Sequence, residues 1–275
     1  MEEDLKEDQF DDDDLISDCV DVLTQLALSP TGIVNDHLNT LLPNLLQLFT
    51  NNLPVSIRES SSFFLRALAE HKPRILGRSG FMREILEAIT MTVSSVKGSA
   101  ARALFTYAPL LDDQDEEEDE YDEETGYDGE DRRALQQMTQ TTLDLIALHV
   151  PSVYLFDDMM EIISGGMNDS NDSGSRKAGC AMLGVVAEGF QDRLRESLPS
   201  TLPALISLLG DEDYTVRECS GFCIGQFCEH IQPDIFAYHA GIIPAAIQAL
   251  TDPRTTVQVC PFFRNIFICF FRCDH

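Results

Sequence analysis

The sequence lacks tryptophan, contains no long apolar run, and holds 19 lysines and arginines against 47 acidic residues, for a formal net charge of −28. Because a membrane-spanning helix needs about 20 consecutive apolar residues, we expect no membrane span. The acidic start also has none of the basic and apolar order of a signal peptide. Nucleic acids and anionic membranes are bound by basic patches, so the shortage of basic residues argues against both and favours basic partners.

Catalytic motifs are also missing. The sequence contains no G-x-S-x-G, no phosphate-binding glycine loop and no H-E-x-x-H. Gly184, Gly189, Gly221 and Gly225 lie within helical stretches, and we interpret them as places of close helix packing. We therefore predict neither an enzyme nor a cofactor.

The eight cysteines have no disulfide-framework spacing and mostly lie among apolar residues, which is typical of reduced thiols in the cytosol or nucleus. Cys219 and Cys223 are one helical turn apart and share a helix face, with Cys228 and His230 following. A metal site needs four ligands that converge on one point, whereas a helix would turn Cys228 to another face. We interpret these cysteines as core residues and predict no metal site.

Most of the negative charge lies in two segments. Residues 1–21 carry eleven acids and one base, and residues 112–131 carry fourteen acids and no base. The remainder is nearly neutral, and with 44% hydrophobic residues the chain has enough apolar side chains for a sizeable core. A segment as acidic and as poor in aliphatic residues as 112–131 is expected to be a disordered loop.

The rest of the chain repeats itself. Pro203 and Pro244 are separated by the same interval as Arg176 and Arg217, and Pro43 opens a similar stretch. An interval of about 40 residues is typical of HEAT and armadillo repeats, in which two antiparallel helices form one unit. We predict an all-α fold: a right-handed superhelical solenoid of about six HEAT repeats, with proline in the opening turn of each first helix.

The predicted organisation is an acidic segment at 1–14, HEAT repeats at 15–111, the acidic loop at 112–131, HEAT repeats at 132–260 and an atypical tail at 261–275. The tail leaves the pattern because Pro261 falls where a second helix should continue. Five phenylalanines follow within residues 262–271.

Basic residues recur at one position of the repeat, at Arg58, Lys97, Arg176 and Arg217. They can form a binding ladder for a partner, or they can tie each second helix to the acidic turn before it, as Arg217 would do with Asp211 or Asp213. We favour the structural interpretation, because a repeated ion pair can set the twist between units even though one exposed pair contributes little. Asp211 and Asp213 also precede a helix, where capping residues are expected.

Several segments stand in a familiar order. They are residues 11–46, then 58–76 with Leu68-Ala69-Glu70-His71-Lys72-Pro73, the acidic loop running into Arg132-Arg133, and 176–226 beginning Arg176-Lys177-Ala178-Gly179. Over residues 11–260 the chain thus resembles a nuclear transport receptor of the importin-beta (karyopherin) superfamily, and among its members the importin-four type.

The resemblance implies a HEAT solenoid that carries basic cargo, such as histones or ribosomal proteins, through nuclear pores and releases it when Ran-GTP binds. It also implies contacts with FG nucleoporins and a location in both cytoplasm and nucleus, and we expect a monomer. The N-terminal repeats of the family, which hold the principal Ran-binding surface, have no counterpart here, nor do its later repeats. We therefore interpret the chain as a fragment.

The candidate partner-binding residues are acidic, because a basic cargo is expected. Nine lie in the loop and three on second helices: Asp115, Glu116, Glu117, Glu118, Asp119, Glu120, Asp122, Glu123, Glu124, Glu188, Glu218 and Glu229. Two alternatives to transport stay open. One is a chaperone of histones or ribosomal proteins that does not respond to Ran-GTP, and the other is a HEAT scaffold with no preference for basic peptides.

Overall fold

The computed structural model describes residues 12–50, 53–98, 126–258 and 266. Within these ranges the regular structure is helical and no β-strand occurs. None of the described helices is both long enough and apolar enough to cross a bilayer. The predicted all-α solenoid of paired helices is confirmed.

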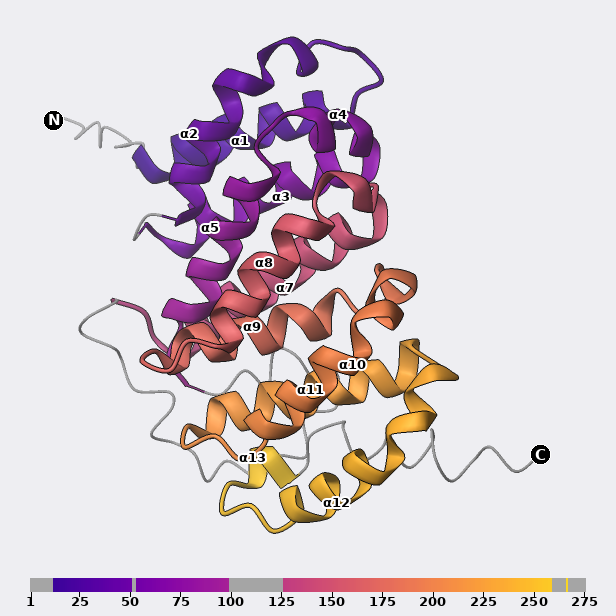
Figure 1. Ribbon diagram of the computed structural model, residues 1–275. Coiled ribbons are helices and arrows are strands. Elements are labelled where there is room, and N and C mark those ends of the chain that lie inside the picture. Colours follow the sequence, from indigo (N-terminus) through magenta and orange to yellow (C-terminus); the bar gives the residue numbers. More distant parts are fainter. Residues whose placement is uncertain (1–11, 51–52, 99–125, 259–265, 267–275) are drawn as a thin grey trace, which may run out of the picture.

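The helices form two layers, and the pairs stack from the indigo end to the yellow end of the molecule (Figure 1). The first layer holds the leading helix of each pair: α2 (Leu38–Thr50), α5 (Met82–Ser95), α8 (Phe156–Met167), α10 (Gln191–Leu208) and α12 (His239–Ala249). The second layer holds α1 (Asp12–Leu28), α3 (Val55–His71), α7 (Gly129–His149), α9 (Ser173–Val185), α11 (Tyr214–His230) and α13 (Thr255–Gln258). Short helices connect some pairs: η1 (Asn35–His37), α4 (Pro73–Arg78), η4 (Ser152–Tyr154) and η5 (Asp234–Tyr238).

The proline prediction is wrong in position. Pro43, Pro203 and Pro244 all lie inside first-layer helices and not in their opening turns. Each helix extends further towards the N-terminus than the proline signal indicated. A proline there removes one backbone donor and bends a helix rather than starting it.

The domain boundaries also shift. Helix α1 begins at Asp12, so part of the predicted 1–14 segment is helical. Helix α7 begins at Gly129 with Asp128 as its N-cap; Asp131 N–H donates to Asp128 Oδ1 at 2.9 Å. Residues 126–131 are therefore ordered, because their acids stabilise a helix N-terminus. In the chain the predicted acidic loop lies between α5 and α7. These are the two helices of one pair, so the loop falls within a pair and not between two successive pairs. The rest of the predicted loop, and the tail apart from Ile266, lie outside the described residues.

The core runs continuously between the layers. Cys180, Cys219, Cys223 and Cys228 are buried free thiols within it, which confirms their interpretation as core residues. Close packing is confirmed at two of the four glycines. A Cβ on Gly184 would lie 2.7 Å from the Phe222 ring, and a Cβ on Gly189 would lie 2.5 Å from the Ala147 carbonyl oxygen.

We predict that Gly189→Ala destabilises the protein by about 2 kcal/mol, because its methyl group meets backbone atoms that cannot move aside alone. Gly165→Ala is the matched control. A Cβ at this exposed position of α8 meets nothing within 4 Å, so the substitution should stabilise the helix by about 0.5–1 kcal/mol. Urea unfolding of both variants measures the difference, and equal effects would contradict the packing role of Gly189.

Candidate functional site

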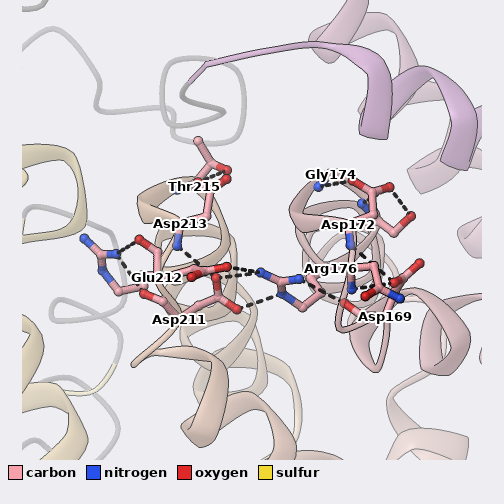
Figure 2. Close-up of polar contacts among 11 residues, drawn as sticks. Asp169, Asp172, Gly174, Arg176, Asp211, Glu212, Asp213 and Thr215 are labelled. Carbon is pink, nitrogen blue, oxygen red and sulfur yellow. Dashed lines mark hydrogen bonds and ion pairs between the residues drawn. The ribbon is translucent and has the colours of Figure 1, made fainter.

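The turns between first and second helices are joined by buried arginines. Arg176 is the fourth residue of α9. Its guanidinium donates to the Asp211 carboxylate from Nε at 2.8 Å and from Nη2 at 3.0 Å, and Nη1 donates to the Asp169 carbonyl at 2.9 Å (Figure 2). Asp169 belongs to the turn before α9, and Asp211 belongs to the turn before α11. One side chain therefore holds two successive repeats together, and we call such an arginine a rung.

Arg217 repeats the arrangement one unit later. It donates to the Asp252 carboxylate at 2.7 and 3.0 Å and to the Asp211 carbonyl at 2.9 Å. The structural interpretation of the ladder holds at these two rungs, but the predicted carboxylate partner of Arg217 is wrong. The carboxylate belongs to the next turn, and the arginine meets its own turn only through carbonyls. Asp213 is the N-cap of α11, where it accepts from the Thr215 N–H at 2.9 Å.

Arg58 forms a third rung without a carboxylate. Its hydrogen bonds go to Phe49 O at 2.9 Å, Tyr127 Oη at 3.0 Å and Thr92 Oγ1 at 3.1 Å. Tyr127 in turn donates to the Leu53 carbonyl at 2.9 Å. Since Tyr127 lies just before α7, this contact fixes the chain at the start of α7 against the turn before α3.

Lys97 is not a rung. It is exposed and follows the end of α5, whereas each arginine rung is the fourth residue of a second-layer helix. Arg58 and Arg217 lie the same number of residues before the last residue of their helices. In α7 the residue at that distance from the helix end is Gln136. The repeat spacing from Arg58 thus leads to a residue that lies between α5 and α7 in the chain, and not to a residue within a second-layer helix.

The rung carboxylates are almost completely removed from water. Side-chain exposures are 9% and 8% for Arg176 and Asp211, and 12% and 9% for Arg217 and Asp252. Burial by itself would raise the pKa of Asp252, but its bonds from Arg217 and from the Arg254 N–H outweigh burial and hold the pKa below its ordinary value. Breaking such a pair leaves a buried charge without its partner.

A second group of charges lies along one edge of the second layer. Because first and second helices alternate in direction, the second-layer helices run the same way and their last residues lie along this edge. Glu188 follows α9, and Glu229 is in the last turn of α11; both are exposed. The Gly189 contact with Ala147 brings the end of α9 against α7, near Asp144 and His149. We call Asp144, Glu188 and Glu229 the acidic edge.

Asp144 is the member of this edge whose ionised form is disfavoured. Partial burial raises the pKa of its carboxyl, the negative charge of Glu188 raises it further, and His230 and His149 act in the opposite direction. The net shift is upwards, so the ionised form is disfavoured in the folded protein. A nearby cation would relieve this repulsion.

The predicted site residues thus divide into three groups. Glu188 and Glu229 lie on a surface that a partner can reach. Glu218 does not, because it is fully buried and lies near the buried amine of Lys177, on which its charge acts; its assignment to a partner surface is wrong. The nine acids of the loop, within residues 115–124, lie outside the described residues.

Sequence reasoning assigned no partner-binding role to Asp144, His149 or His230. Lys177, whose Nζ donates to the Val96 carbonyl, was also treated only as part of a family segment. The sequence holds one signal for the histidines, which is a shared interval. His71, His149 and His230 follow Arg58, Gln136 and Arg217 by the same number of residues. The closeness of His230 to Asp144 depends on the stacking, because these two residues lie on different helices.

The fold and the rungs define the class of the protein as a HEAT-repeat solenoid. The family model described as "HEAT-like repeat" matches residues 174–227, which contain the Arg176 and Arg217 rungs.

Sequence relatives extend the comparison beyond that segment. Mouse (Mus musculus) importin-4 is 26% identical over 235 residues, which are 85% of this chain and 20% of that protein. Human (Homo sapiens) importin-4 is 31% identical over 140 residues, 50% of this chain and 12% of that protein. The chain therefore spans about a fifth of the length of the mouse protein it matches.

Solved structures agree in fold. The crystal structure of Kap121p bound to Pho4p superposes with a TM-score of 0.76 at 20% identity, over 94% of this chain and 24% of that chain. The resemblance to the importin-beta superfamily is confirmed by these findings together: the chain is similar to a segment of such karyopherins in sequence, in repeat type and in fold.

We predict that Arg176→Met lowers the free energy of unfolding by about 3 kcal/mol, because it leaves Asp211 buried without its guanidinium. In the double variant Arg176→Met/Asp211→Leu most of the loss should be recovered, since neither charge remains. Arg83→Met is the control. Arg83 makes ion pairs with Glu87 and Glu161, but its side chain is 42% exposed, so the loss should be small beside that of Arg176→Met.

These variants are compared by chemical denaturation at pH 7. A double variant that is as unstable as Arg176→Met alone would contradict the proposed pairing with Asp211.

We predict that Asp144→Asn stabilises the protein at pH 7 by about 0.5 kcal/mol. A carboxyl with a raised folded-state pKa binds its proton more tightly in the folded state, so stability falls as pH rises through its titration. The gain should therefore be present at pH 7 and vanish at pH 3, where the carboxyl is protonated. Thermal unfolding at both pH values measures it, and a loss of stability at pH 7 would contradict the repulsion described above.

Proposed function

We propose that the chain forms part of a nuclear import receptor and binds a lysine- or arginine-rich segment of a cargo protein along the acidic edge. The observation that carries the proposal is the position of Asp144 beside Glu188, where burial and the neighbouring charge raise the pKa of Asp144. Two like charges kept close together on an accessible surface cost stability, and a bound ammonium or guanidinium group would turn that cost into attraction.

The architecture supports a long, extended binding surface. Asp144, Glu188 and Glu229 stand at the ends of three successive second-layer helices, so they are spaced along the stacking direction. An extended peptide laid across these helices can place successive basic residues against successive acids. The net charge of −28 would speed the encounter and make it strongly dependent on salt.

Relatives support the class of partner. Kap121p has been crystallised with Pho4p and with RanGTP. By analogy we propose protein cargo for this chain, with histones and ribosomal proteins as candidates, together with release by Ran-GTP, contacts with FG nucleoporins, and movement between cytoplasm and nucleus. We propose binding in place of catalysis, and residues 115–124 as a further acidic contact that tunes affinity.

We predict that Glu188→Gln/Glu229→Gln weakens binding of a fluorescent lysine-rich peptide by about tenfold, since two of the three charges of the acidic edge are removed. The matched control is Glu84→Gln/Glu196→Gln, which removes the same net charge from exposed positions of the first layer. This control should bind like the parent. Fluorescence anisotropy at several salt concentrations measures the affinities and their salt dependence.

Equal losses in both double variants would contradict the acidic edge and indicate only a diffuse effect of net charge. Release of the peptide on addition of Ran-GTP would support the transport proposal. A chaperone without transport activity would keep its peptide.

A further inference from the structure

The acidic edge is lined by histidines as well as acids. His71 is the last residue of α3, His149 the last residue of α7 and His230 the last residue of α11. His71 and His149 are exposed, and His230 is partly exposed. We call these three residues the histidine row.

The α9 unit shows why the row has a gap. The residue that follows Arg176 at the same interval is Gly189. A side chain there would collide with the Ala147 carbonyl oxygen at 2.5 Å, so only glycine fits where α9 closes on α7. The same contact places Glu188 between the helices that end in His149 and His230.

Each histidine has an acid beside it. His71 Nε2 lies 3.9 Å from Glu70 Oε2, and Glu229 directly precedes His230. His149, on the same helix, and His230, at the end of α11, both act on the half-buried Asp144. Each histidine thus stands at a helix C-terminus, where a positive charge is generally favoured.

Several basic side chains near the row have partners within the structure, whereas Arg74, in α4 just after His71, is exposed. On α3, Arg66 stacks over the Phe63 ring at 4.0 Å and its charge interacts with Glu59 and Glu70. In the segments that follow the helix ends, Lys72 donates to the Ser29 and Thr31 carbonyls. Arg193 pairs with Asp157 at 3.0 Å, and Arg195 pairs with Asp234 at 3.2 Å.

We propose that the histidine row makes capture of a basic partner depend on pH: the edge attracts a lysine-rich segment at pH 7.5, and protonation of the histidines weakens that attraction. The proposal rests on the function proposed above. An imidazole generally gains its charge between about pH 8 and pH 5, whereas the carboxylates of Glu70, Asp144, Glu188 and Glu229 supply four negative charges. Three protonated histidines would cancel most of them.

The linkage between peptide binding and proton binding determines whether the affinity rises or falls with pH. A bound polycation disfavours protonated histidines, so binding releases protons, and lowering the pH must weaken binding. Lysine side chains keep their charge over this range, which means that the pH dependence arises from the protein and not from the peptide.

The test is the affinity of a histidine-free lysine-glycine peptide at pH 7.5 and pH 6.0, measured by fluorescence anisotropy in low salt. We expect binding to weaken about fivefold at pH 6.0 in the parent protein. In His71→Asn/His149→Asn/His230→Asn the change should fall below about twofold. The control His37→Asn/His239→Asn removes histidines from η1 and from the start of α12, and should behave like the parent.

Proton NMR titration of the histidine rings gives a second measurement. Saturating peptide should lower the pKa values of the histidine row and leave those of His37 and His239 unchanged. Where the triple variant unfolds by circular dichroism, His149→Asn alone takes its place and should remove part of the pH dependence.

The outcomes separate the two proposals. Binding that is equally tight at both pH values would overturn the pH dependence and leave the acidic edge intact. A pH dependence that persists in the folded triple variant would also overturn it. No binding at pH 7.5 would overturn the acidic edge itself, and the pH dependence with it.

Discussion

The interaction on which the structure depends is the buried arginine that joins one inter-helix turn to the next. The core of a solenoid is a layer that extends along the stack and not a central cluster, because each repeat contacts only its neighbours. Arg176 and Arg217 bind a carboxylate in the following turn with two parallel hydrogen bonds each, which sets both the distance and the orientation between repeats. Arg58 does the same with neutral oxygens, and Tyr127 supplies one of them. The chain can thus carry a long acidic insertion inside one helix pair and still continue the stack.

The regular stacking is also what creates the acidic edge. Helix ends that are far apart in sequence are brought side by side, and the glycine contact at Gly189 brings Glu188 close to Asp144. The resulting repulsion is a cost that the rungs and the core offset. Binding surfaces commonly keep such strain, because the interaction that relieves it is supplied by the partner.

Much of this could be predicted from the sequence. The repeat period, the arginine register, the buried cysteines and the cap at Asp213 all follow from local patterns of apolar and polar residues. The errors have a common cause. Proline lies inside the first-layer helices and not at their start, the spacing from Arg58 leads to Lys97 outside the second layer, and Glu218 is fully buried and not at a surface. To avoid these errors one must know where a helix begins or in which direction a side chain faces.

The sequence by itself determined the class of the fold, because a helix pair whose apolar stripe recurs with every repeat can bury that stripe only by stacking on its neighbours. Tertiary structure alone decided which carboxylate meets which arginine. The partner of Arg217 is Asp252, in the turn of the next unit, and nothing local distinguishes it from Asp211 or Asp213. Tertiary structure also decided that Asp144, Glu188 and the histidine row share one edge, because electrostatic interactions depend on distances through space that only the stacked helices define.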